Sequence, residues 1–459
     1  MPLDPVPGLL SRATELLEAE FSTLPSLEPI AETDRMAGVL EQVAHRLGDN
    51  YPYFHPLYAG QMLKPPHPIA RAAYALAMTI NPNNHARDGG RASSEMEIEA
   101  VRELAGMFGW TEYLGHLTSS GTLANLEALW VGGQVAAASR PGLRVLASEQ
   151  AHYTHHRISA VLQLPFSRVA ADERGCMRLD LLEAELKKGD VGTVVATLGT
   201  TAIGAVDPLD HILELRDRYG FRVHVDAAYG GYFRLIPDAL GEPARDAYAA
   251  IDEADSIVID PHKHGLQPYG CGCVLFRDPS VERFYKHDSP YTYFTSKQLH
   301  LGEISLECSR AGAAAVALWA TQQLLPLVPG GEFARGLAQG RAAALEFDRR
   351  LRADGRFQPL KAGPPELDIV VWKIQSSSPA ETSRKPQDIF DSCASHDLHL
   401  ALVQLPLSWF GSAGIAPNQP ENELVTCLRS VLMKPEHEQW IDRIWDRFLT
   451  ACAASMGDQ

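Results

Sequence analysis

The sequence is poor in cysteine, has fewer basic than acidic residues, and contains no long apolar run. Its seven cysteines are scattered through 459 residues, and the closest pair, Cys271 and Cys273, lacks the further ligands that a metal site needs. The 57 acidic and 41 basic residues give a formal charge of −16, which argues against nucleic acid or an anionic membrane as a partner. No segment reaches the length of a membrane span, and residues 1–7 lack the features of a secretion signal, so we expect a cytoplasmic protein with reduced thiols.

The remaining composition is that of a globular protein with a sizeable core. Hydrophobic residues make up 45% and charged residues 21% of the chain, which suits two or three structural units. Residues 1–75 are expected to form a helical N-terminal arm, because they hold too few apolar residues for a core of their own. A break at residues 326–331 separates a large domain, 76–325, from a small C-terminal α+β domain, 326–459.

Helical segments alternate with short runs of β-branched residues in the large domain, which predicts an α/β fold. We expect strands at residues 143–147, 192–197, 222–225, 256–259 and 273–276, and at 367–372 in the small domain. Such alternation is typical of a mainly parallel sheet with helices on both faces. The fifth run follows the fourth after a short turn, so we expect it to pair antiparallel.

The residues that follow these strands are unusually polar. In an open parallel sheet, ligands bind beyond the carboxyl ends of the strands, so residues that follow different strands meet at one edge. The segments concerned are Ser148–His152, Leu198–Thr201, Asp226–Gly231 and Asp260–Lys263. Segments far apart in the sequence are therefore predicted to form one site.

Lys263 is the most informative of these residues. It follows an apolar run that begins at Ser256, where a charged ammonium is costly to bury. Desolvation favours the neutral amine, which can condense with the aldehyde of pyridoxal 5′-phosphate (PLP) to form a Schiff base. Lys263 is therefore a candidate anchor for that cofactor.

Three other segments supply what a PLP site needs. Asp226 would pair with the pyridine nitrogen and keep it protonated, so that the ring accepts electrons. His152 would lie against one face of the ring, and Ala228 is small enough to pack on the other. Residues 118–122 (Thr-Ser-Ser-Gly-Thr) precede a strong helical run, and hydroxyls, a glycine and the positive end of a helix dipole suit a phosphate.

Each of these residues taken alone has a simpler explanation. Asp226 and the Ser-Gly-Thr segment could be helix caps, His152 a structural histidine, and Lys263 a side chain that reaches the surface. His152, His155 and His156 also have the spacing of a metal-binding helix face, but no carboxylate or cysteine ligands accompany them. The joint occurrence of the motifs favours the PLP site, and we predict no metal.

The combined motifs resemble group II PLP-dependent amino-acid decarboxylases, which are fold-type-I PLP enzymes. The matching segments occur in family order and are Thr118–Asn125, Ala151–Tyr153, Leu198–Thr201, His224–Gly231 and Asp260–Lys263. The resemblance implies the fold-type-I PLP-dependent transferase fold, PLP as the cofactor, and a homodimer with active sites at the subunit interface. It also implies that Lys263 is the Schiff-base lysine, Asp226 the pyridine partner and His152 the ring-stacking residue.

The same resemblance implies further contacts. Phosphate contacts would come from Ser120, Gly121, Thr122 and His262. Thr200 or Thr201 would lie near the phenolic oxygen of the cofactor or near the substrate. The arm segment Tyr53–Gly60 is similar to the family's substrate-pocket element, which makes His55 and Tyr58 candidate substrate contacts.

The sequence departs from the family pattern in two places. Ser120 stands where many of these decarboxylases have a second glycine. Segments 286–294 and 307–312 look closer to archaeal tyrosine/aspartate decarboxylases and sphingosine-phosphate lyase than to animal aromatic decarboxylases. Tyr291 and Tyr293 are candidates for returning a proton to the substrate, or for aromatic packing at a dimer interface. Arg310 could receive a substrate carboxylate or a phosphate, or form a structural ion pair.

The reaction expected from these features is α-decarboxylation of an L-amino acid to the amine and carbon dioxide. Tyr51, Tyr53, Phe54 and Tyr58 favour a tyrosine-like substrate, although packing explains these aromatic residues as well. A carbon–carbon lyase, or a decarboxylating oxidative deaminase that gives an aldehyde, would use the same cofactor. A catalytically silent PLP-binding protein is the alternative outside enzymes, but it would need no electron sink such as Asp226.

Overall fold

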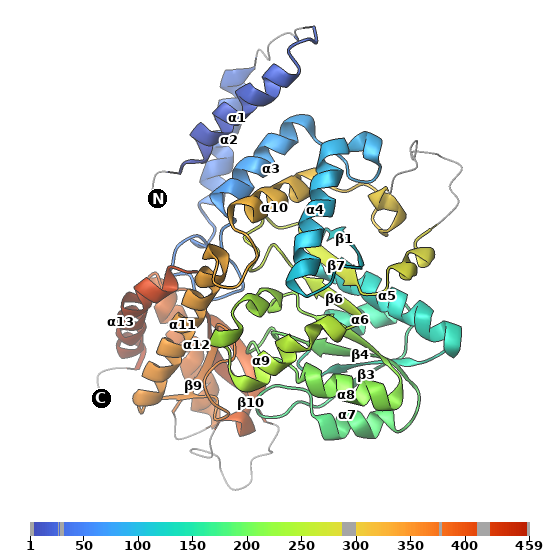
Figure 1. Ribbon diagram of the computed structural model, residues 1–459. Coiled ribbons are helices and arrows are strands. Elements are labelled where there is room, and N and C mark those ends of the chain that lie inside the picture. Colours follow the sequence, from blue (N-terminus) through green and yellow to red (C-terminus); the bar gives the residue numbers. More distant parts are fainter. Residues whose placement is uncertain are drawn as a thin grey trace.

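The computed structural model describes residues 4–25, 27, 32–286, 300–375, 379–410 and 423–456. Its large domain is built on a seven-stranded sheet (Figure 1). In spatial order the strands are β1 (Leu114–Thr118), β7 (Gly272–Phe276), β6 (Ser256–Ile259), β5 (Arg222–Asp226), β4 (Val191–Thr197), β2 (Arg144–Ser148) and β3 (Phe166–Val169). β7 is antiparallel to both of its neighbours, and the other adjacent pairs are parallel.

The predicted α/β fold is confirmed, including the antiparallel pairing of the run at 273–276. Two strands of the sheet, β1 and β3, were not predicted from the sequence. β1 contains Gly115 and His116, and β3 is a short edge strand with Ser167 and Arg168 at its centre. Neither strand therefore shows the β-branched run that identifies the central strands.

Helices cover both faces of this sheet. The helices that follow the arm in the large domain are α3 (Pro68–Ile80), α4 (Arg91–Met107), α5 (Gly121–Ser139), α6 (Thr154–Val161), α7 (Leu179–Leu186), α8 (Leu209–Tyr219), α9 (Glu242–Ala249) and α10 (Gly312–Leu324). Val194 and Ala196 of β4 pack in the apolar cluster that includes α8 and α9, whereas Val195 packs in the cluster that includes α5 and α6. This alternation buries β4 on both faces, as expected for a central parallel strand.

The small domain has a four-stranded antiparallel sheet. Its strands are β10 (Ala401–Pro406), β11 (Leu424–Val431), β9 (Ile369–Ile374) and β8 (Phe357–Pro359), in that spatial order. Its helices are α11 (Glu332–Ala353), α12 (Pro379–Ser395) and α13 (His437–Met456). Phe347, Trp372 and Phe448 are fully buried between the sheet and the helices. The predicted strand at 367–372 is β9, which begins and ends two residues later.

Short 3-10 helices complete the described structure. They are η1 (Arg87–Gly89), η2 (Gly231–Leu235), η3 (Pro237–Ala239), η4 (Ile251–Glu253), η5 (Pro279–Phe284), η6 (Leu301–Glu303) and η7 (Leu407–Trp409). In the part of the chain that the structure describes, no helix has the length and apolarity needed to cross a membrane.

The N-terminal arm joins both domains. Its helices α1 (Val6–Glu20) and α2 (Thr33–Leu47) contain no buried residue and extend away from the body of the molecule (Figure 1). The following segment is tied to the small domain, because Ala59 N donates to His399 O at 2.9 Å and Ala59 O accepts from Val431 N at 2.7 Å. The predicted boundary at residue 75 falls inside α3.

Candidate active site

Parallel strands bring four of the predicted segments to one edge of the large sheet. β2, β4, β5 and β6 are consecutive parallel neighbours. The register places Thr197 beside Asp226, and Asp226 beside Val258. The residues that follow these strands therefore emerge at the same edge, where ligands bind in open α/β sheets.

Lys263 lies in the turn directly after β6 and contacts Asp260. Its Nζ is 3.1 Å from Asp260 Oδ2, and its side chain is 23% exposed. The Asp260 carboxylate is buried, and its Oδ1 has no hydrogen-bond partner among the described residues. A buried polar atom of this kind calls for a ligand or water. The amine of Lys263 therefore lies beside a carboxylate that is only partly satisfied.

Asp226 ends β5 and is held by His155 of α6. His155 Nε2 donates to Asp226 Oδ2 at 2.8 Å, and Ala228 N donates to Asp226 Oδ1 at 3.1 Å. Burial alone would raise the pKa of the Asp226 carboxyl, but the hydrogen bond and favourable electrostatics of His155, with the charge of Lys263, hold that pKa well below its usual range. Asp226 is therefore ionised at neutral pH although it is buried.

His152 lies within electrostatic reach of both Asp226 and Lys263. Its Nδ1 and Thr154 Oγ1 are 2.8 Å apart. Burial lowers the pKa of His152, while the charge of Asp226 opposes and that of Lys263 reinforces this effect. The half-buried ring is therefore neutral at pH 7, which suits stacking on a planar cofactor.

The three neighbouring histidines do not converge on one point. His155 contacts Asp226, whereas His156 is exposed and its ring centroid lies 5.6 Å from that of Phe166. Among the described residues, no cluster of His, Cys, Asp and Glu could hold a metal ion. The metal-binding explanation of their spacing therefore has no support in the geometry.

The start of α5 forms the predicted phosphate segment. Ser120 is the N-cap, and its Oγ accepts from Leu123 N at 3.3 Å. A Cβ on Gly121 would stand 2.4 Å from Asp260 Oδ2, so only glycine allows this approach. The first N–H groups of a helix have no partner within the helix. Ser119 N donates at 2.8 Å to Glu307 Oε2, a contact that the sequence did not suggest.

His262 immediately precedes Lys263, and Ala228 follows Asp226 by two residues. His262 Nδ1 donates to Cys271 O at 2.7 Å, and its Nε2 lies 3.6 Å from Asp260 Oδ2. Burial lowers the pKa of His262. Ala228 is buried, and its backbone N–H holds Asp226.

Thr200 and Thr201 lie on the loop after β4. The Oγ1 of Thr200 accepts from Ala205 N at 3.0 Å, so it closes this loop. Thr201 is exposed, and its carbonyl accepts from Arg429 Nη2 at 2.7 Å. Arg429 of β11 also donates to Gly60 O at 3.3 Å. This buried arginine, which sequence reasoning missed, joins the arm, the Thr200–Thr201 loop and the small domain.

His55 and Tyr58, the two candidate substrate contacts in the arm, have different surroundings. Tyr58 is buried, its ring centroid lies 4.9 Å from that of Tyr53, and burial raises its pKa to about 12. Tyr58 interacts electrostatically with Tyr269, whose ring lies 4.9 Å from that of His262. His55 instead packs against Trp440 of α13, with ring centroids 4.9 Å apart. Tyr58 is therefore the arm residue on the side of the site.

The remaining candidates lie away from this cluster or outside the described residues. Arg310 forms a buried ion pair with Glu97 of α4, with Nη1 at 2.9 Å from Oε1, and also donates to Leu117 O. This geometry corresponds to the structural alternative for Arg310. Tyr291 and Tyr293 fall in the segment 287–299, outside the described residues.

The residues that cluster here fit PLP. An ionised carboxylate (Asp226), an amine (Lys263), a neutral ring (His152) and the start of α5 are what the pyridine nitrogen, aldehyde, ring face and phosphate require. The unsatisfied Oδ1 of Asp260 and the narrow space over Gly121 lie between the amine and the helix start.

Comparisons with known proteins support the same conclusion. A model of the pyridoxal-dependent decarboxylase conserved domain matches residues 33–374, well over half of the chain. The L-tyrosine decarboxylase of Enterococcus faecium is 26% identical over 93% of this chain and 89% of that protein. A probable L-tyrosine/L-aspartate decarboxylase of Methanothermobacter thermautotrophicus is 28% identical over 72% of this chain and 86% of that protein.

Three solved structures share the fold. Mouse CSAD matches with a TM-score of 0.76 and 22% identity, over 95% of this chain and 92% of that one. Oryza sativa TDC with PLP and tryptamine matches with a TM-score of 0.77 and 17% identity, over 100% of both chains. Rhodiola rosea 4-hydroxyphenylacetaldehyde synthase has a TM-score of 0.76 and 18% identity, over 99% of this chain and 94% of that one.

Lys263 lies beside Asp260 and within electrostatic reach of the ionised Asp226, and all three residues fall in the segment that the domain model matches. The chain therefore belongs to the pyridoxal-dependent decarboxylase family and is a PLP-dependent amino-acid decarboxylase.

Proposed function

We propose that this enzyme decarboxylates an aromatic L-amino acid, with tyrosine-like substrates preferred, to the corresponding amine and carbon dioxide. The observation that carries the proposal is the buried, ionised Asp226 held by His155 within electrostatic reach of Lys263. Decarboxylation leaves an electron pair on the α-carbon, and a protonated ring nitrogen opposite Asp226 is what takes up such a pair. The tyrosine decarboxylases among the relatives support the choice of substrate.

PLP, when bound, supplies an aldehyde that captures an amine and a pyridine ring that accepts electrons. Lys263 would hold the cofactor through its amine. Asp226 would keep a proton on the ring nitrogen, because its low pKa leaves it negatively charged. His152 would cover one face of the ring and exclude water from it. Ser120, Gly121 and Thr122 would hold the phosphate at the start of α5, with His262 beside them.

The substrate side of the site is formed by the arm. Tyr51, Tyr53 and Tyr58 form an aromatic group whose ring centroids lie 4.9–6.4 Å apart. Arg429 donates hydrogen bonds to the carbonyls of both Gly60 and Thr201. It therefore links the arm, two residues after Tyr58, to the loop after β4. These contacts support an aromatic pocket over the cofactor. Tyr291 and Tyr293 remain the proposed donors of the proton that returns to the α-carbon.

The second candidate reaction is oxidative decarboxylation to an aldehyde. It is considered because a protein of the same fold, 4-hydroxyphenylacetaldehyde synthase, has a name that states an aldehyde product. Fold alone does not select between the two reactions. A carbon–carbon lyase reaction is distinguished from both by the absence of carbon dioxide.

A homodimer is the assembly that we propose. α2 carries an apolar stripe, defined by Met36, Val39, Leu40, Val43 and Leu47, in which every side chain is 43–65% exposed. An exposed stripe at helical spacing is a surface that a partner covers. For the compartment we propose the cytoplasm, and all seven cysteines are unpaired, as in a reducing environment.

A product assay tests the reaction directly. Purified holoenzyme incubated with each of the twenty amino acids is expected to release one carbon dioxide and one amine per tyrosine-like substrate, without ammonia. Measuring carbon dioxide, amine, aldehyde and ammonia together separates the candidates. Stoichiometric aldehyde and ammonia would establish the oxidative reaction instead, and turnover confined to acidic amino acids would remove the aromatic assignment.

His155→Ala tests whether the histidine keeps Asp226 ionised. Without the hydrogen bond the pKa of Asp226 rises, so the carboxylate is protonated at a higher pH and the acidic limb of the kcat–pH profile moves upward. We expect that acidic limb to lie about one pH unit or more above its position in the wild type, because a pKa shift of one unit moves the titration midpoint by one pH unit. The visible absorption of the bound cofactor should titrate with the same shift.

The matched control for that variant is His156→Ala, because His156 is adjacent and exposed. It should leave both titrations unchanged. If His155→Ala retains the wild-type pH profile in turnover and in absorption, the histidine does not control the charge of Asp226.

Charges placed on the α2 stripe test the dimer. Val39→Asp with Val43→Asp is expected to convert a particle of twice the chain mass into one of a single chain, measured by light scattering after size exclusion. Gln42→Asp adds charge to the same helix away from the stripe and should leave the mass unchanged. A wild-type protein that elutes as a monomer at all concentrations would contradict the dimer.

A further inference from the structure

A cavity of about 420 Å³ lies between the arm, the large domain and the small domain. We call it the arm cavity; its lining includes Lys64 to Pro68, His264, Leu266, part of α11 and Lys434 to Glu436. None of Lys263, Asp226 and His152 is among its lining residues. Its volume lies within the range of small-molecule sites in proteins.

Two lysine ammonium groups border this cavity, and neither forms a salt bridge with a carboxylate among the described residues, although Glu436 of the lining acts on both electrostatically. Lys434 is 2% exposed, and its Nζ donates to the carbonyl of Tyr58. Lys64 Nζ makes a long contact of 3.5 Å with Met433 O. Within the described ranges, neither lysine forms an ion pair, although buried charges in proteins are ordinarily paired. The cavity therefore has an excess of positive charge.

Burial shifts the pKa values of both lysines. It lowers the pKa of Lys64 to about 8, although the charges of Asp368 and Glu436 oppose this shift. Burial, followed by the charge of Lys64, lowers the pKa of Lys434 to about 7. Both shifts oppose the charged form, so a negative group between the two lysines would stabilise them.

His264 adds a third polar group to the wall. It follows Lys263 in the chain, and its side chain is 1% exposed. Its Nε2 lies 3.3 Å from Asp368 Oδ2, yet neither ring nitrogen makes a hydrogen bond among the described residues. Tyr229 OH donates a hydrogen bond to the other carboxylate oxygen of Asp368, Oδ1, at 2.5 Å. His264 thus remains a buried polar side chain with hydrogen-bonding capacity left over, at the cavity wall.

The lining also includes Glu332, Arg335 and Glu436, so it holds three cations and two anions. Much of its remaining surface is apolar. Leu266, Leu325, Phe333 and Leu337 line one part, and Pro65, Pro66, Pro68 and Pro435 line another. A ligand that matches this lining has a negative head and a short apolar body. Inorganic anions would leave the apolar wall unused, and neutral apolar molecules would leave the lysines unpaired.

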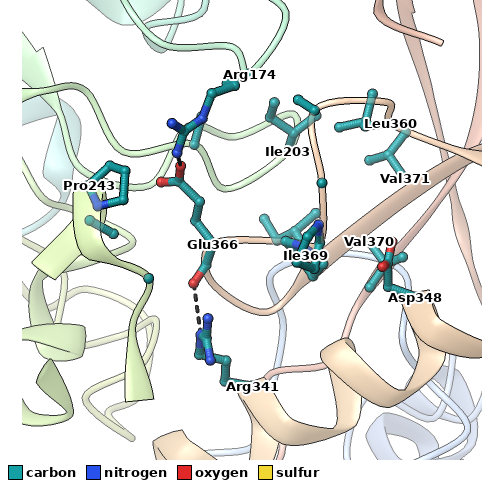
Figure 2. Close-up of a pocket in the computed structure, with 17 residues that line it drawn as sticks. Arg174, Ile203, Pro243, Arg341, Asp348, Leu360, Glu366, Ile369, Val370 and Val371 are labelled. Atoms are coloured by element: carbon teal, nitrogen blue, oxygen red, sulfur yellow. Dashed lines mark hydrogen bonds and ion pairs between the residues drawn. The ribbon is translucent and has the colours of Figure 1, made fainter. Parts of the chain in front are cut away.

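A second cavity shows the contrast (Figure 2). It has a volume of about 310 Å³ and lies between the loop after β4, α9 and the small domain. Its two arginines already contact one acidic residue, since Arg174 pairs with a Glu366 carboxylate oxygen and Arg341 Nε donates to Glu366 O at 2.9 Å. One cation of that cavity, Arg174, is therefore paired with a carboxylate, whereas Lys64 and Lys434 in the arm cavity contact only backbone carbonyl oxygens among the described residues.

We propose that the arm cavity is a second ligand site, which binds a small organic carboxylate with its charged group between Lys64 and Lys434 and its apolar chain along Leu266 and Phe333. The bound carboxylate also strengthens the contact of Lys434 with the Tyr58 carbonyl, and so holds the arm segment that borders the active site. The site is independent of the reaction that the enzyme catalyses.

The test uses holoenzyme and straight-chain carboxylates from butyrate to octanoate as probes. These molecules have no amine, so they cannot replace Lys263 on the cofactor. At least one is expected to raise the thermal unfolding midpoint in a saturable way, because a ligand that binds only the folded state stabilises it. The corresponding amides, which have the same chain without charge, should leave the midpoint unchanged.

Lys64→Met tests whether the carboxylate binds in the arm cavity or at another place on the protein. The variant removes an unpaired cation, so it should fold with a midpoint equal to or above that of the wild type. Its affinity for the stabilising carboxylate should fall about tenfold or more, the effect of losing one charge-assisted hydrogen bond. Lys187→Met, at an exposed lysine directly after α7, removes the same charge elsewhere and should bind as the wild type does.

Calorimetric titration of the wild type with carboxylate and amide keeps the test independent of any variant. A carboxylate that binds while its amide does not supports the site. The proposal is overturned if no carboxylate in the series binds, if the amide binds equally well, or if Lys64→Met and the wild type have the same affinity.

Discussion

The site depends on one negative charge that is kept ionised inside the protein. Asp226 is buried, and a buried carboxylate ordinarily takes up a proton. His155 Nε2 and Ala228 N each donate to one oxygen of Asp226, and Lys263 adds a favourable charge. These partners come from α6, from the turn after β5 and from the turn after β6. The parallel sheet brings these three elements together, so the ionisation of Asp226 depends on the order of the strands.

The junction with the arm and the small domain is built with further buried charges. Arg429 of β11 donates hydrogen bonds to the carbonyls of Gly60 and Thr201. Asp368 accepts a hydrogen bond from the hydroxyl of Tyr229, which lies three residues after Asp226. Small-domain residues therefore contact both the arm and the turn that follows Asp226. Lys64 and Lys434 lie at the same junction, and neither forms a salt bridge within the described ranges. A carboxylate bound in the arm cavity, as proposed, would add a negative charge between them.

The sequence allowed the central strands to be predicted, and it singled out segments that the fold brings to one edge of the sheet, because both depend on short local patterns. Lys263 follows an apolar run, and Ser120 to Thr122 precede a helix. His155 was visible only as one of three spaced histidines, since its pairing with Asp226 spans 71 residues and two elements. Arg429 and Arg310 could not be assigned from sequence for the same reason: an arginine's partner is decided by tertiary packing. β1 and β3 lacked the composition that marks a strand.

The most direct test of the account is the position of the covalent cofactor. Holoenzyme treated with borohydride, then digested and analysed by mass spectrometry, should carry a reduced phosphopyridoxyl group on the peptide that contains Lys263. Lys263→Ala should carry none on the corresponding peptide and should lack the visible absorption of the wild type. Modification of another lysine, such as Lys64 or Lys434, with Lys263 unmodified, would contradict the central claim.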